Sequence, residues 1–350
     1  MGGCYTNFMD SRFSKLSFIV FSVALFILVG LWVESGRSDP TDTVIETATT
    51  TKEVTTSTEP ELPSFLATFF PDTDFTDADP SIYKLISGGP PKDGIPSIDE
   101  PEFVTLNAFK RSDDVLAVVL EGDGITKVYP YNILTWHEIV NDEIDGKPVS
   151  VTFCPLCGSA IVYDRRLPAG ETTFGVSGGL IESNMVMYDR MTESLWQQST
   201  GEALAGVYRG ETLSLVPFQL LTMSEIKDKY PKAQVLSENT GYSRDYGRNP
   251  YSGYDEDNER FVFNISGFST AYDAKEIMVV FRVDGTPVAT PWLELAEGEV
   301  KAAEVNGKDI TITKTDGELT VEDPDGQIIP FYFEMWFSFA LQHGENASVI

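Results

Sequence analysis

Residues 148–163 read Pro-Val-Ser-Val-Thr-Phe-Cys-Pro-Leu-Cys-Gly-Ser-Ala-Ile-Val-Tyr, and this segment carries the strongest signal in the chain. Its two ends, 148–153 and 160–163, are rich in β-branched and aromatic residues and predict two strands. The Cys-Pro-x-Cys-Gly run between them predicts a tight turn that brings two thiols to one point. Since the 350-residue chain has only 3 cysteines and 2 histidines, we expect its chemistry at this turn.

The pattern of short elements continues on both sides of the turn. Apolar residues at helical spacing predict a short helix at 131–140, and Thr222 with Glu225 has the capping-box pattern for a second helix at 222–230. The other signals are strands, at residues 115–120, 126–129, 172–176, 185–188 and 212–216. Because 42% of the residues are hydrophobic and can fill a core, the sequence predicts a β-rich α+β fold.

Comparison of the chain with itself reveals a repeat at an offset of 161 residues. Residues 123–152 align without gaps with 284–313, with nine identities in 30 pairs. We therefore expect two related β lobes from an internal duplication: 64–270 holds the first repeat, and 271–350 holds the second repeat and a C-terminal aromatic block. A chance similarity of two hairpin units is the alternative. The second copy lacks the chemistry, with Gly298, Thr315 and Glu318 in place of His137, Cys154 and Cys157.

The N-terminus has the pattern of a membrane anchor. Residues 16–33 contain no charged residue and are long enough to cross a bilayer, and Arg12 and Lys15 precede them. We expect a cytoplasmic segment at 1–15, a transmembrane anchor at 16–34 and a disordered Thr/Glu-rich linker at 35–63. The protein would then be a single-pass protein of the cell membrane with an extracytoplasmic C-terminal domain. A cleaved signal peptide is the alternative.

The charge of the chain limits its partners. Fifty-four acidic residues against 25 basic ones give a formal net charge of −29 at pH 7. We expect no nucleic-acid partner, because binding phosphates needs a basic face. The membrane is the partner that the sequence predicts, through residues 16–33, and a protein or small-molecule partner stays unknown.

The first hypothesis for the thiol turn is a transition-metal site for copper or zinc. Cys154 and Cys157 supply two ligands, and a closed tetrahedral zinc site needs four. His137 is the expected third ligand, and His343 or Met187 the fourth; a methionine would favour copper. For each histidine the alternative is a hydrogen-bonded core residue without a ligand role.

Two further hypotheses stay open. In a thiol-disulfide oxidoreductase, Cys154 and Cys157 alternate between dithiol and disulfide while His137 or Glu138 moves protons. Such a pair would differ from the thioredoxin type, in which a helix follows the first thiol. In the third hypothesis the turn is a structural knuckle, and the chain is a non-catalytic β-rich binding module.

Long polar side chains alternate with apolar ones in residues 183–202. Arg190, Glu193 and Gln198 could line a pocket beside the thiol turn. An ordinary strand with one polar and one apolar face is the alternative.

Several blocks of this sequence resemble domain-of-unknown-function family 3179. These blocks are residues 136–142 (WHEIVND), 151–158 (VTFCPLCG), 173–178 (TFGVSG), 187–202 (MYDRMTESLWQQSTGE) and the aromatic block that ends at 339–343 (FALQH). The resemblance covers the chain from about residue 81 to its end. It implies an exported or membrane-tethered protein without an established activity. Some family members are selenoproteins, and a selenocysteine in place of one thiol of the pair would imply redox or metal chemistry.

Overall fold

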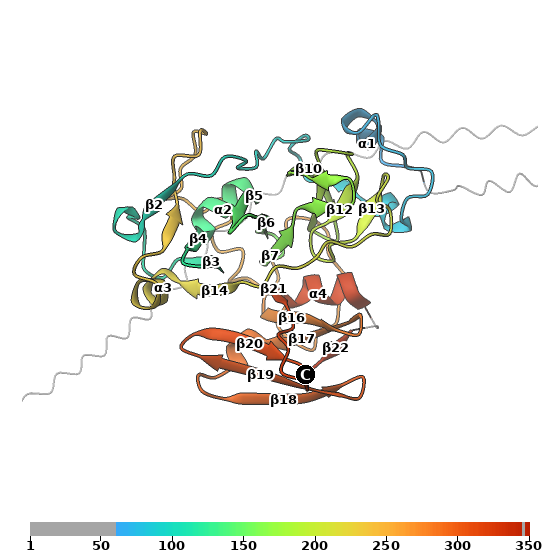
Figure 1. Cartoon of the computed structure of the whole chain (residues 1–350). Coiled ribbons are helices and arrows are strands. Elements are labelled where there is room, and N and C mark those ends of the chain that lie inside the picture. Colours follow the sequence, from blue (N-terminus) through green and yellow to red (C-terminus); the bar gives the residue numbers. More distant parts are fainter. Residues whose placement is uncertain (1–60, 345–346) are drawn as a thin grey trace, which may run out of the picture. The chain divides into compact units, whose positions relative to one another are not determined.

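The computed structural model describes residues 61–344 and 347–350 (Figure 1). The expected cytoplasmic segment, the membrane anchor and the linker up to residue 60 lie outside this part. Among the described helices, none is long and apolar enough to cross a membrane. The described residues belong to one compact unit, which is rich in strands and has few helices, as the sequence predicts.

Short strands make up most of the regular structure. In chain order they are β1 (Ile86–Ser87), β2 (Phe103–Thr105), β3 (Leu116–Glu121), β4 (Thr126–Pro130), β5 (Ile139–Ile144), β6 (Lys147–Cys154), β7 (Ser159–Asp164), β8 (Arg166–Leu167), β9 (Gly170–Glu171), β10 (Phe174–Ile181) and β11 (Asn184–Asp189). They continue with β12 (Leu195–Gln197), β13 (Ala203–Ala205), β14 (Gln219–Thr222), β15 (Gln234–Leu236), β16 (Ile277–Val283), β17 (Thr286–Pro291), β18 (Val300–Val305), β19 (Lys308–Thr315), β20 (Glu318–Glu322), β21 (Phe331–Met335) and β22 (Ser348–Val349).

These strands form three larger sheets and two small ones in the described part of the chain. The largest sheet has the order β22-β17-β16-β21-β7-β6-β5. Two five-stranded sheets have the orders β14-β3-β4-β15-β2 and β1-β10-β11-β12-β13. β18, β19 and β20 form a separate sheet, and β8 pairs with β9 (Figure 1).

The helices are short. They confirm the predicted capping box at residues 222–225 and correct the length of the helix predicted over 131–140. They are α1 (Ser64–Phe69), α2 (Tyr131–His137), α3 (Met223–Lys229) and α4 (Trp336–His343), with 3-10 turns η1 (Pro80–Lys84), η2 (Leu106–Ala108) and η3 (Trp292–Glu294). The predicted capping box at α3 is present, with Thr222 and Glu225 each accepting from the other's backbone N–H.

The helix predicted over 131–140 ends three residues early. Glu138 has φ +59°, which no α-helix contains, and the next residues leave the helix axis. Ile139 and Val140 then pair with Thr152 and Val151 in the β5–β6 ladder. β-branched side chains fit a pleated strand better than a helix, and here the neighbouring strand decides. Residues 212–216, predicted as a strand, contribute only isolated bridges.

The two segments related by the offset of 161 residues have the same strand pairings. The hairpin β3–β4 has the register of β16–β17, and β5–β6 has the register of β18–β19. β14 and β21 pair with the first strand of their hairpins, and β15 and β22 run parallel to the second. Matching pairs are Ala117–Pro130 and Met278–Pro291, Ile139–Thr152 and Val300–Thr313, Leu116–Thr222 and Ile277–Met335, and Lys127–Gln234 and Val288–Ser348.

One strand pairing and one side-chain contact also join the two segments, so they do not form separate lobes. β7, from the first segment, pairs with β21 of the second through Ala160 and Phe333. In the opposite direction, the side-chain amide of Gln219 in β14 bonds both the N–H and the C=O of Leu319 in β20, each at 2.9 Å. The expected boundary near residue 270 therefore does not divide the sheets, because the largest sheet contains strands from both sides of it.

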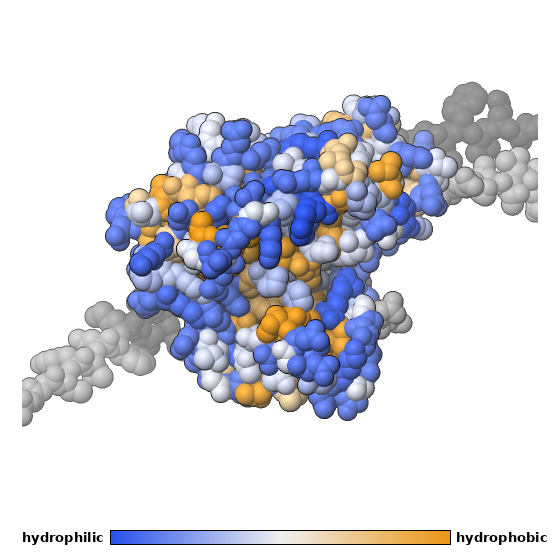
Figure 2. Space-filling view, in the orientation of Figure 1, coloured by the Kyte–Doolittle hydropathy of each residue, from blue (hydrophilic) through white to orange (hydrophobic). Residues whose placement is uncertain are grey.

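The hydrophobic core also contains residues of both segments. Its main cluster combines residues from both segments, among them Val151 and Ile161 with Val279 and Phe333. Two smaller clusters lie under α1 with β11–β13, and under α3 with β3 and β14. Figure 2 shows a mostly hydrophilic surface with apolar patches, one of them near the centre of the view.

Candidate functional site

The thiol turn is the four-residue connection between β6 and β7. Cys154 ends β6 and pairs with Ser159, the first residue of β7, and the N–H of Cys157 donates to Cys154 O at 3.1 Å. Gly158 closes the turn at φ +56°, a conformation that favours glycine. Both thiols are free, and their residues are 1% and 0% exposed. The prediction of a turn with two adjacent thiols is confirmed.

The two thiols have opposite tendencies to ionise. Burial opposes ionisation of Cys154, but hydrogen bonds from the Cys157 thiol and from the N–H groups of Met185, Cys157 and Leu156 outweigh it and lower its pKa. Burial raises the pKa of Cys157 well above its usual value, and its bond to Cys154 raises it further. Of the two thiols, Cys154 therefore ionises more readily, and Cys157 favours its protonated form.

A second turn contacts the pair from the other side. β10 and β11 are joined by Glu182 and Ser183, both at positive φ. In its thiol form, Cys154 donates to Ser183 O at 3.6 Å. Sequence reasoning missed this contact, because nothing local to either turn indicates that they meet.

Glu138 lies beside Cys154, as the redox hypothesis expects. Its backbone C=O accepts from Phe153 N–H at 2.7 Å, which places it next to the end of β6. Burial raises the pKa of its carboxyl well above the usual value, and the charge of Cys154 raises it further. The carboxyl of Glu138 therefore favours its neutral form, the more so when Cys154 is ionised.

His137 is a brace between two loops. Its Nδ1 is 2.8 Å from Pro96 O and its Nε2 is 2.6 Å from Tyr246 Oη. Because a carbonyl can only accept, Nδ1 carries the proton and Nε2 accepts from the tyrosine. Burial lowers the pKa of the ring, which keeps it neutral. Since both nitrogens are engaged, the expectation of His137 as a third metal ligand needs correction.

His343 belongs to a buried polar cluster on α4 and β21. Its Nε2 is 3.0 Å from Tyr332 Oη and 3.6 Å from Glu334 Oε1. Glu334 is 0% exposed and its other oxygen accepts from Ser199 Oγ at 2.9 Å. The charge of Glu334 also raises the pKa of Cys157, so this cluster lies near the second thiol.

The remaining ligand candidate, Met187, lies inside β11. It pairs with Val176 and Trp196 and belongs to the main core cluster. In the part of the chain that is described, no group of three or more His, Cys, Asp and Glu side chains is arranged to hold a metal ion. Copper or zinc at the thiol turn stays a prediction.

Of the three long polar side chains in 183–202, one supports the thiol turn. Gln198 Oε1 accepts from Ser159 Oγ at 2.7 Å, and its Nε2 donates to Thr152 Oγ1 at 3.0 Å. The amide therefore links the two strands that carry the turn. Glu193 instead pairs with Lys92.

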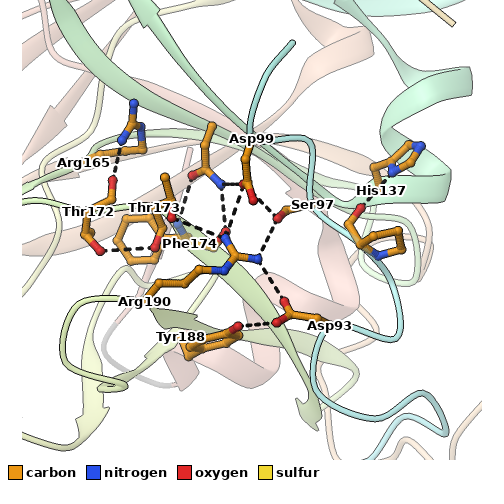
Figure 3. A network of polar contacts seen from close by, with 12 residues as sticks. Asp93, Ser97, Asp99, His137, Arg165, Thr172, Thr173, Phe174, Tyr188 and Arg190 are labelled. Atoms are coloured by element: carbon orange, nitrogen blue, oxygen red, sulfur yellow. Dashed lines mark hydrogen bonds and ion pairs between the residues drawn. The ribbon is translucent and has the colours of Figure 1, made fainter. Parts of the chain in front are cut away.

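Arg190 organises a separate network that fastens the segment at residues 93–99 (Figure 3). Its guanidinium contacts Asp93 at 3.0 Å, Asp99 at 3.3 Å and Phe174 O at 2.9 Å. Tyr188, in β11 just before Arg190, also donates to Asp93. The same segment supplies Pro96 to His137, so this network positions one partner of the brace.

A cavity of about 620 Å³ lies against the thiol turn. Pro155 and Gly158 line it, together with Tyr251, Tyr254 and Lys275. Tyr254 donates to Leu156 O at 2.9 Å, which ties the loop after β15 to the turn. This cavity was missed from the sequence, because its lining comes from distant parts of the chain.

The comparisons with known proteins give one match. Neither the curated proteins nor the solved structures contain a match to this chain. The family model described as "Protein of unknown function (DUF3179)" matches residues 92–343, a range that contains both thiols, Glu138, His137 and His343. This range confirms the resemblance of the signature blocks. The chain therefore belongs to the DUF3179 family.

Proposed function

We propose that Cys154 and Cys157 are a redox-active dithiol that exchanges with small disulfides. The observation that carries this proposal is that two free, buried cysteines lie three residues apart at one tight turn, where the pKa of Cys154 is lowered and that of Cys157 is raised. It makes Cys154 the nucleophile, since thiolates and not thiols attack disulfides. Cys157 is then held at the position that a resolving thiol needs.

The exchange follows ordinary thiol-disulfide chemistry. The Cys154 thiolate attacks one sulfur of a disulfide RSSR, and the other sulfur leaves as a thiolate. Cys157 then attacks the Cys154 sulfur, its proton passes to the departing thiolate, and the second RSH leaves. In total, two protein thiols and RSSR give one protein disulfide and two RSH. In the reverse direction, Glu138 can supply a proton to Cys154, because its carboxyl is neutral and adjacent.

Burial of the pair limits the partner. Both thiols are buried, and the cavity reaches the turn at Pro155 and Gly158. A small disulfide that enters this cavity fits better than a folded protein. The slow step would then be movement of the turn.

The test uses the full chain with Cys4→Ser, which removes the third cysteine, so that every thiol measured belongs to Cys154 or Cys157. In glutathione buffers we expect one intramolecular disulfide, measured by alkylation and mass spectrometry, with a midpoint potential above about −300 mV. Cys154→Ser and Cys157→Ser should each abolish it, while Thr315→Ser, at the matching position of the second segment, should not. The proposal would be contradicted if the protein stays folded in oxidised glutathione and both thiols remain reduced.

A metal ion at the same two sulfurs is the second candidate, favoured by their convergence at one turn. Copper or zinc would need further ligands, with His343 and Met187 as the expected ones. Elemental analysis of the purified full chain separates the two functions. Stoichiometric metal that disappears in Cys154→Ser supports a metal site, and a metal-free protein that forms the disulfide supports redox chemistry.

We also propose that the two related segments arose by duplication and that the chain is anchored in the membrane. The shared registers of four strand pairs support the duplication. The uncharged run at 16–33 supports the anchor and an extracytoplasmic domain. Protease added to intact cells should digest the domain; protection of the domain would contradict this orientation.

A further inference from the structure

Lys275 is a buried amine beside the thiol turn. It lies two residues before β16 and is 6% exposed. Its Nζ has no hydrogen-bond partner among the described residues. Three aromatic rings surround it, with ring centroids at 3.2 Å for Tyr254, 4.4 Å for Phe261 and 5.0 Å for Phe337. The protein therefore gives this ammonium group aromatic faces but no acceptor.

The ammonium group of Lys275 lacks a hydrogen-bond acceptor among the described residues, although Asp255 and Asp257 are near enough to act on its charge. Aromatic faces attract a cation, but they do not replace the acceptors that an ammonium has in water. Burial lowers the pKa of Lys275 to about 8, and nearby Cys157, Asp255 and Asp257 oppose that effect. At neutral pH most molecules still carry the charge. A buried cation without an acceptor is a polar group for which a ligand can complete the hydrogen bonds.

The cavity of about 620 Å³ next to this amine is lined by aromatic and other apolar side chains together with several polar ones. Its aromatic lining comes from Tyr131, Phe153, Tyr251, Tyr254 and Trp292, which belong to both related segments and to the loop between them. Ligand sites combine such apolar walls with a few polar groups that fix orientation. A cavity of this volume with several aromatic side chains in its lining accommodates an aromatic molecule of two or three fused rings.

The other cations at the cavity are already accounted for. Arg111 forms a bidentate pair with Glu238, and Arg248 is exposed to solvent. Lys275 is thus the buried cation of this lining that is left without an acceptor in the described part of the chain. An anionic group on a ligand would bind at the Lys275 end.

We propose that this cavity is a binding site for a flat, apolar aromatic molecule that carries one carboxylate, with Lys275 as the partner of that carboxylate. A carboxylate is favoured over a neutral carbonyl because it also balances the buried charge. The site goes beyond the dithiol function and does not depend on it. Tyr254 connects the two, since its ring faces Lys275 and its hydroxyl bonds Leu156 O in the turn.

The test is a calorimetric titration of the full chain with 2-naphthoate and with the neutral 2-naphthalenemethanol. We expect Lys275→Met to weaken naphthoate binding at least about tenfold, because one charge-assisted contact is lost, and to leave the alcohol unchanged. Lys232→Met removes an exposed charge away from the cavity and should change neither titration.

Each other outcome overturns the site. Equal naphthoate affinity in Lys275→Met would show that the amine does not bind the carboxylate, and no binding of either probe would exclude the ligand class. Circular dichroism of each variant controls for folding. Naphthoate should bind Cys154→Ser as well as the unchanged protein, so failure of the redox proposal would leave this result intact.

Discussion

The strands β6–β7 and β19–β20 hold matching places in the two related segments, yet they have opposite surroundings. Every residue of β6 but the first is buried, on both faces. β19 alternates, with Ile310 and Ile312 buried and the residues between them half-buried. The connections differ too: between β6, which ends at Cys154, and β7 there are four residues that include Cys157, and between β19 and β20 there are only Asp316 and Gly317.

This difference shows what the thiol turn requires. A two-residue turn with both residues at positive φ is the ordinary hairpin connection and needs nothing from the rest of the protein. The four-residue thiol turn is instead covered by β10–β11, β21 and the loop that carries Tyr254. Burial raises the pKa of Cys157 and of Glu138, so the chemistry of the turn depends on its cover.

The largest expected effect on stability comes from introducing a charge at matching positions of β6 and β19. Thr152 is buried between Ile161 O and Gln198, whereas Thr313 is half-buried on the outer face of β19. Thr152→Lys should cost about 3–5 kcal/mol of unfolding free energy, because it leaves an unpaired buried charge. Thr313→Lys should change it by less than about 0.5 kcal/mol. Urea unfolding measures both, and similar losses would show that the two strands are equally enclosed.

The next effect concerns Lys275, whose matching position in the first segment is the exposed Asp114. Its pKa is lowered from 10.5 to about 8, so the unfolded state binds more protons between these pH values. The stability of the unchanged protein should therefore rise across this window, by up to about 3 kcal/mol. Lys275→Met should lack that rise.

Urea unfolding of both proteins at several pH values between 7.5 and 10.5 measures this difference. Asp114→Asn is the control and should keep the rise. If the unfolding free energy of the unchanged protein does not rise relative to that of Lys275→Met over these pH values, the amine is not buried as a cation.

The smallest expected effect distinguishes the glycines that close the two turns. Gly158 has φ +56° and an added Cβ would lie 2.9 Å from Met335 Cγ, in the core. Gly317 has φ +80° and its Cβ would lie 3.1 Å from Glu225 Oε1, the end of a flexible side chain. Gly158→Ala should cost about 2 kcal/mol and Gly317→Ala about 1 kcal/mol, since both strain the backbone but only the first also overpacks. Equal losses in thermal or urea unfolding would remove the packing argument.

Sequence patterns predicted the local features of this molecule well. The turn with its thiols, the strands beside it and the capping box of α3 all follow from residues close together in the chain. The helix predicted over 131–140 was too long, because Ile139 and Val140 belong to β5 and pair with β6. His137 was expected at a metal and instead bonds Pro96 and Tyr246.

The sequence by itself determined where two thiols meet and which strands carry them, because tight turns and strand alternation depend on neighbouring residues. Only the tertiary structure decided what surrounds the thiols. The pairing of β7 with β21, the contact of Gln219 with β20, the contact of Ser183 with Cys154 and the aromatic cage of Lys275 all join distant parts of the chain. Tyr254 and Leu156 are 98 residues apart, and no local pattern encodes such a contact. It forms because folding buries both residues against the same core.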